Sequence, residues 1–89
     1  MRAVVSVIGK DCVGILANVS AVCAESHMNI TDVTQSILQD MFVMIMIVEF
    51  TDESTQLAAF SERMTQLGKE KNLAIHVMHE DIFNAMHRI

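Results

Sequence analysis

Apolar residues recur at every second position, or run without a break, along four stretches of strand length. These stretches predict β-strands at residues 2–8 (RAVVSVI), 30–38 (ITDVTQSIL), 41–50 (MFVMIMIVEF) and 73–78 (LAIHVM). In the second stretch, Val33 and Ile37 lie on one side and the polar residues lie on the other. Only Gln39 and Asp40 separate the second stretch from the third, so we expect a two-residue hairpin turn there.

Two further stretches carry apolar residues at helical spacing. One begins after Gly14, repeats through Ile15, Val19 and Val22, and ends at residues 27–29. The other follows Asp52 or Ser54, either of which can cap it, and shows one apolar stripe of Leu57, Phe60, Met64 and Leu67. Residues 81–89 (DIFNAMHRI) predict a short amphipathic helix at the tail. The order βαββαβ with a tail helix predicts an α+β, ferredoxin-like sandwich, in which two helices cover one face of a four-stranded antiparallel sheet.

The third predicted strand is apolar on both faces, although the two helices cover only one. Val43, Ile45 and Ile47 share one side, and whichever set faces the helices leaves the other on the open face. Burying four such side chains is worth about 6–12 kcal/mol, comparable to the ~5–15 kcal/mol stability of a whole domain. We therefore predict a homodimer with the tail helix contributing to the interface. The residues assigned to that interface are Phe42, Met44, Met46, Val48 and His76.

The arrangement of the two subunits stays open between an edge-to-edge and a face-to-face dimer. The bulky side chains of Phe42, Met44 and Met46 favour the face-to-face form, or a tail helix lying across the sheet. In the face-to-face form, His76 would meet its mate in its neutral state, and dimerisation would be sensitive to mild acid.

Composition and charge narrow the classes of function. With 89 residues and 52% hydrophobic content, the chain accommodates one domain, residues 1–89. A formal net charge of −5 and an aromatic content of 4% argue against a nucleic-acid-binding module. No apolar run approaches the ~20 residues of a membrane-spanning helix. The two cysteines are too few for a disulfide framework, which indicates a reduced, cytoplasmic protein.

The loop between the first predicted strand and the first predicted helix is the main candidate site. It reads GKDCVGIL over residues 9–16, and Gly14 within it has no Cβ, so another group can approach its backbone closely. Gly14 also precedes a helix N-terminus, where unpaired N–H groups attract a carboxylate or another anion. Taken alone, a glycine at a strand-to-helix turn more often reflects plain turn chemistry.

This loop and the βαββαβ order together resemble the ACT domain, a regulatory module that binds small ligands. The resemblance covers nearly the whole length, through residues 11–16 (DCVGIL), residues 28–30 (MNI) and the elements between them. The stand-alone length and the ending EDIFNAMHRI resemble a bacterial and archaeal group of single-ACT proteins, related in pattern to ACT regulators of the glycine cleavage system.

The resemblance implies a homodimer that binds a small ligand, usually an amino acid, at the subunit interface. In that family the ligand contacts the glycine loop of one subunit and the start of the second strand of the other. Gly14 matches the glycine, Asp11 the polar loop residue before it, and Asn29 the polar residue before the second strand. The implied ligand-binding residues are Asp11, Cys12, Val13, Gly14, Ile15, Asn29 and Ile30. Val13 replaces a common proline, and Asp11 can pair with a ligand ammonium group.

Other candidate chemistry is weaker. His76 and His79 are three apart on a predicted strand, so they point to opposite faces and do not share a metal ion easily. Cys12, near a helix N-terminus, could have some thiolate character, which leaves a redox or metal sensor through Cys12 or His79 as a third possibility. We expect no resident metal, no cofactor and no catalytic set.

Two functions therefore stand side by side. The first is a regulatory ACT module that binds an amino acid as a homodimer and acts on a separate enzyme or regulator. The second is a ligand-free interaction subunit that docks a partner through its sheet face and its tail helix.

Overall fold

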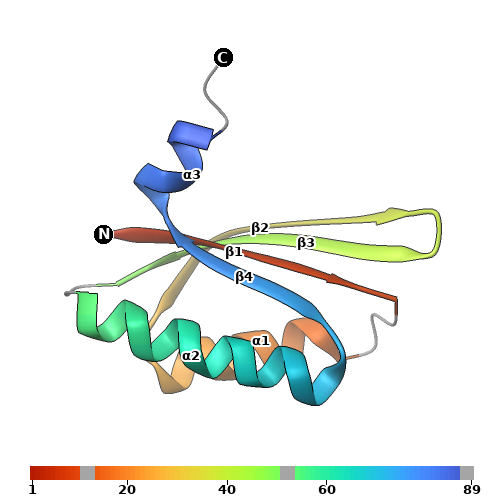
Figure 1. The fold of residues 1–89 in the computed structure, drawn as a ribbon, viewed down its shortest axis with the longest axis horizontal. Helices are drawn as coiled ribbons and strands as arrows, with labels where there is room; N and C mark the ends of the chain where they lie inside the picture. Colours follow the sequence, from red (N-terminus) through yellow and green to blue (C-terminus); the bar gives the residue numbers. More distant parts are fainter. Residues whose placement is uncertain (11–13, 51–53, 87–89) are drawn as a thin grey trace.

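The computed structural model describes residues 1–10, 14–50 and 54–86. In chain order the elements are β1 (Arg2–Gly9), α1 (Ile15–Glu25), β2 (Asn29–Leu38), β3 (Met41–Glu49), α2 (Ser54–Lys71), β4 (Ala74–His79) and α3 (Glu80–Met86). The four strands form one antiparallel sheet in the order β2-β3-β1-β4. Helices α1 and α2 lie together on one face of this sheet (Figure 1). The predicted ferredoxin-like fold is confirmed.

The predicted end of the first helix is confirmed, and the backbone explains it. His27 has a positive φ of 58°, which turns the chain out of the helix. The N–H of His27 then donates to the Ala24 carbonyl at 3.2 Å, and the N–H of Met28 donates to the Cys23 carbonyl at 2.8 Å. These two bonds satisfy carbonyl groups that the last turn would otherwise leave open. The chain can therefore enter β2 directly at Asn29.

The predicted hairpin turn is also confirmed. Leu38 pairs with Met41 as the last partners of β2 and β3, which leaves Gln39 and Asp40 as the two-residue turn. Gln39 adopts a positive φ of 59°, as the first position of such a turn requires. Of the two N-cap residues expected for α2, Asp52 lies outside the described residues and Ser54 is the first residue of the helix.

The hydrophobic core lies between the sheet and helices α1 and α2. Its side chains alternate along β1 and β3, and helices α1 and α2 cover them with their apolar stripes. The central residues are Ala3, Val5, Val7, Val19, Cys23, Met44, Met46, Val48, Phe60 and Met64, each fully or almost fully buried. Val5 is paired with Met46, and Val7 with Met44, so the side chains of each pair share this face.

The assignment of four interface residues to the open face is wrong. Phe42 is 7% exposed, and Met44, Met46 and Val48 are 0% exposed, because helices of the same chain cover them. The second set of the third predicted strand, Val43, Ile45 and Ile47, therefore lies on the open face. His76 does lie there, since it is exposed and is paired with Ser6 of β1. Its part in a face-to-face contact stays a prediction.

Helix α3 covers only one end of the open face. It contacts β1 and β4 and projects away from the sheet beside the N-terminus, rather than lying across the strands (Figure 1). Arg2 of β1 holds its first turn through an ion pair with Glu80, with 2.6 Å between Nη2 and Oε2. Ile82 and Met86 of α3 stay exposed, as does Ile45 in the middle of the face. Residues 87–89 of the predicted tail helix lie outside the described part of the chain.

No helix within the described ranges is both long and apolar enough to cross a membrane.

Alanine substitutions on the two faces of β3 should lower the free energy of unfolding by different amounts. Met46→Ala removes a fully buried side chain, and we expect it to lower the free energy of unfolding by about 2–5 kcal/mol. Ile45, the adjacent residue, is 38% exposed on the open face. Ile45→Ala should therefore lower the free energy of unfolding by no more than about 1.5 kcal/mol. Urea denaturation at several protein concentrations measures both. A larger loss for Ile45→Ala at low concentration would contradict the assignment of the faces.

Candidate functional site

Gly14 opens helix α1 in a left-handed conformation. Its φ is 75° and its ψ is 3°, values that cost an L-residue about 1–2 kcal/mol. A Cβ at this position would meet only the Asn18 Nδ2 atom, at an ordinary contact distance of 3.7 Å. The conformation, rather than a lack of space, therefore requires glycine here. The preceding candidates Asp11, Cys12 and Val13 lie outside the described residues.

The first turn of α1 presents backbone donors. Within the described residues, no side chain makes a capping hydrogen bond to this turn and no acidic residue lies in it, and the first helical bond runs from the Asn18 N–H to the Gly14 carbonyl at 2.9 Å. The Ile15 side chain is 3% exposed and packs in the core. Ile15 can therefore contact a ligand through its backbone only. Leu16, one residue further on, is 41% exposed and points out of the core.

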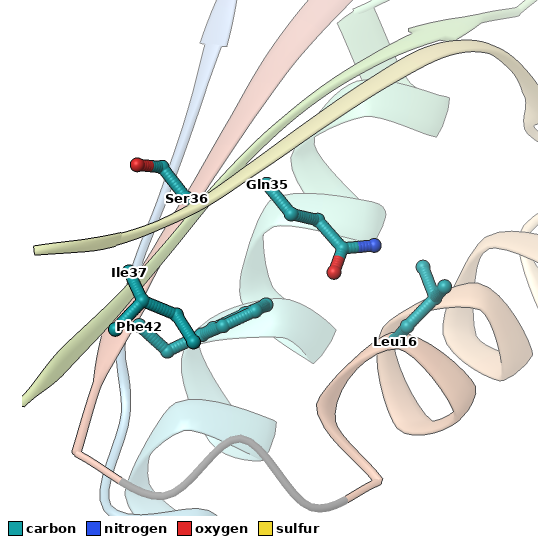
Figure 2. A pocket seen from close by; sticks show the side chains of 5 residues that line it. All are labelled: Leu16, Gln35, Ser36, Ile37 and Phe42. Atoms are coloured by element: carbon teal, nitrogen blue, oxygen red, sulfur yellow. The ribbon is translucent and has the colours of Figure 1, made fainter.

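A hollow of about 470 Å³ lies beside this first turn. We call it the Gln35 hollow; its lining residues are Leu16, Gln35, Ser36, Ile37 and Phe42. Figure 2 shows the Gln35 amide extending toward Leu16 across the opening, and the Ser36 side chain on the other side of the strand. Phe42 is 7% exposed, so it forms a wall that is continuous with the core. The hollow is thus framed by α1, β2 and β3.

The strand-entry residue Asn29 lies at the other end of α1. It lines a second hollow of about 480 Å³ with Ala24, His27, Met28, Glu49 and Phe50. Because α1 is 11 residues long, roughly 16 Å of helix, at about 1.5 Å per residue, separates Gly14 from Asn29. One copy of the chain therefore does not bring together the residues that the resemblance assigns to one ligand. Ile30, the other strand-entry candidate, is 38% exposed.

The histidines of β4 are separated as the alternation predicts. His79 is paired with Ala3 of the core face, whereas His76 lies on the open face. His79 Nδ1 accepts a hydrogen bond from the Asp81 N–H at 3.1 Å, which caps the start of α3. Among the residues that the structure describes, no three His, Cys, Asp or Glu side chains gather closely enough to hold a metal ion. His87 lies outside those residues.

The apolar pattern of the sequence did not predict the Gln35 hollow. Its alternation does place Val33 and Ile37 on the helix side of β2, and Gln35 lies between them on the same side. An exposed amide on the side of a strand that faces its own helices is the signal that could have found it. The hollow could not be predicted in full from β2 alone, because its other walls, Leu16 and Phe42, come from two other elements that meet β2 only in the folded chain.

The chain is similar to known proteins over nearly its full length. A family model described as the ACT domain matches residues 2–78. The UPF0237 protein of Methanosarcina acetivorans is 44% identical over 88 residues, which are 99% of this chain and 96% of that relative. The solved ACT domain protein from Streptococcus pneumoniae superimposes with a TM-score of 0.82 at 34% identity, covering 98% of both chains.

A more distant structural neighbour supports the fold alone. It is a protein assigned as a glycine cleavage system transcriptional repressor, with a TM-score of 0.74 at 18% identity. The match covers 85% of this chain and 43% of that one.

The buried thiol of Cys23 predicts a pH dependence of stability. Cys23 is 1% exposed, with its Sγ atom 3.8 Å from the Met46 sulfur, and burial raises the pKa of its thiol from 9.0 to about 11. Because the folded state favours the neutral thiol, this contribution to stability is present below about pH 9 and is lost as pH rises toward about 11, by up to about 1.4 kcal/mol per unit. Cys23→Ala should lose this part of the pH dependence.

Urea denaturation of both proteins between neutral pH and about pH 11 checks this expectation. The difference in unfolding free energy between wild type and Cys23→Ala should shrink above about pH 9. A difference that stays constant over the whole range would contradict it.

Proposed function

This chain belongs to the ACT domain family, and we therefore propose that it is a regulatory homodimer that binds an amino acid between its subunits. A separate enzyme or regulator responds to the bound state. The chain has no catalytic role of its own, and it acts in the cytoplasm, where a thiol such as Cys23 stays reduced.

The observation that carries this proposal is the distance between Gly14 and Asn29 within one copy. Strand β2 is an edge of the sheet, so one side of its ten-residue backbone has no strand partner within the described chain. Such an edge pairs readily with another strand. If β2 pairs antiparallel with β2 of a second copy about a two-fold axis, the start of each strand lies beside the end of the other.

That pairing assembles the site that one copy leaves divided. Asn29 and Ile30 of one subunit approach the Ile37 end of β2 in the other, where the Gln35 hollow and the first turn of α1 lie. Ile30 and Ile37 are 38% and 67% exposed, and their register with Val48 and Phe42 puts both on the helix side of the sheet. Each exposed isoleucine of one copy thus meets one of the other, which supports the edge-to-edge arrangement.

The chemistry at this seam suits an amino acid. The first-turn N–H groups of α1 can donate to a carboxylate. The Asn29 amide, brought by the second subunit, adds a neutral donor and acceptor. A ligand that contacts both subunits binds the paired state better than the separate chains, so its binding energy favours one dimer geometry.

The open face and α3 favour the second candidate function, a docking subunit that binds no metabolite. Ile45 is 38% exposed in the middle of the face, and Ile82 and Met86 of α3 are 56% and 65% exposed on the same side of the sheet. A partner protein could cover these side chains without any ligand. The two functions differ in whether an amino acid stabilises the chain.

Thermal unfolding in the presence of each of the twenty amino acids tests the proposed function. We expect at least one to raise the melting temperature, since a ligand at a hundred times its dissociation constant adds about 2.7 kcal/mol. Sugars and nucleotides at the same concentrations are the control and should have no effect. If no amino acid stabilises the protein, the regulatory proposal is wrong and the docking function takes its place.

The dimer is tested by a charge at the centre of the edge strand. Thr34 is exposed near the middle of β2, so Thr34→Lys places two ammonium groups side by side across the seam. Sedimentation equilibrium should show a wild-type dimer and a dissociation constant about tenfold higher for Thr34→Lys. Gln66→Lys, on the exposed surface of α2, is the matched control and should leave the constant unchanged. A wild-type monomer, or equal constants for the two variants, would count against the edge-to-edge dimer.

A further inference from the structure

The lining of the Gln35 hollow is mainly apolar and carries no charge. Leu16 from α1, Ile37 from β2 and Phe42 from β3 give it three apolar walls. None of its five described lining residues carries a charge. A charged group placed there would lose water and find no ion-pair partner among these five residues, which is costly.

One polar group points into this apolar space. The Gln35 amide extends from β2 toward Leu16 (Figure 2), and no hydrogen bond joins it to another described residue. A single amide offers a donor and an acceptor, which is enough to orient a small ligand without selecting for charge.

From these observations we propose that the hollow selects amino acids with an uncharged, apolar side chain, of the size of valine, leucine, isoleucine, methionine or phenylalanine. The inference rests on the proposed function and names the class of its ligand. The α-carboxylate lies at the first turn of α1, and the side chain enters the hollow between Leu16 and Ile37. Ile30 of the second subunit closes the outer side.

The size of the expected discrimination follows from the buried surface. Each methylene group moved from water into an apolar site is worth about fourfold in affinity. Glycine and serine leave the hollow empty, and aspartate and lysine place a charge in it. We therefore expect leucine, isoleucine or phenylalanine to bind at least tenfold more tightly than any of these four.

The experiment is calorimetric titration of the full chain with these seven amino acids, followed by two variants titrated with the tightest one. Ile37→Asp and Leu16→Glu each put a carboxylate into the hollow at a position that is already 67% or 41% exposed, so the fold should tolerate both. Leu38→Asp is the matched control, because Leu38 is also 67% exposed but lies on the open-face side of the same strand.

The proposal expects a loss of at least tenfold in affinity for Ile37→Asp and Leu16→Glu, and less than twofold for Leu38→Asp. Sedimentation of each variant separates a loss of ligand affinity from a loss of dimer, and Leu16→Glu, which is not on the edge strand, should keep the dimer. Tight binding of glycine, serine, aspartate or lysine would overturn the selectivity and leave the proposed function in place. If none of the seven amino acids binds, this inference is wrong. If, in addition, none of the twenty amino acids changes thermal unfolding, the proposed function is wrong as well.

Discussion

Among the residues that the structure describes, strand β2 pairs along one side only, with β3. Its other side faces away from β3 and presents a row of backbone N–H and C=O groups at the edge of the sheet opposite β4. An edge of ten residues that continues into a tight hairpin is a template for a further strand. Three proposed features depend on which strand pairs with this edge. They are the dimer itself, the approach of Asn29 of one subunit to Gly14 of the other, and the closing of the Gln35 hollow.

The pattern of apolar residues predicted the elements and their order because local chemistry decides both. Local sequence is enough to predict three of these features: the β-branched run of β1, the apolar stripe of α1 around Val19, and the two-residue turn at Gln39. The pattern did not predict which side of β3 faces the helices, since Met46 and Ile45 are both apolar. That choice depends on the register of β3 against β1, in which Met46 is paired with Val5, and register is a property of the paired strands rather than of any one strand.

The residues of the candidate site also differ in whether the sequence alone could identify them. Gly14 could be identified as a candidate from the sequence. The positive φ before α1 favours glycine, so this conformational requirement is apparent from the residue type itself. Asn29 was found through the resemblance to the ACT domain, and the structure then separated it from Gly14 by the length of α1. The Gln35 hollow could not be found from one segment, because Leu16, Gln35 and Phe42 meet only after three elements have packed.

If two copies join along β2, Ile30 of one chain lies against Ile37 of the other, and this contact can be measured. NMR of a dimer mixed from isotope-labelled and unlabelled chains, with isotope filtering, reports only contacts between subunits. The edge-to-edge dimer should give cross-peaks from Ile30 of one chain to Ile37 of the other. Cross-peaks among Ile45, Ile82 and Met86 in their place, or no contacts between subunits at all, would contradict it.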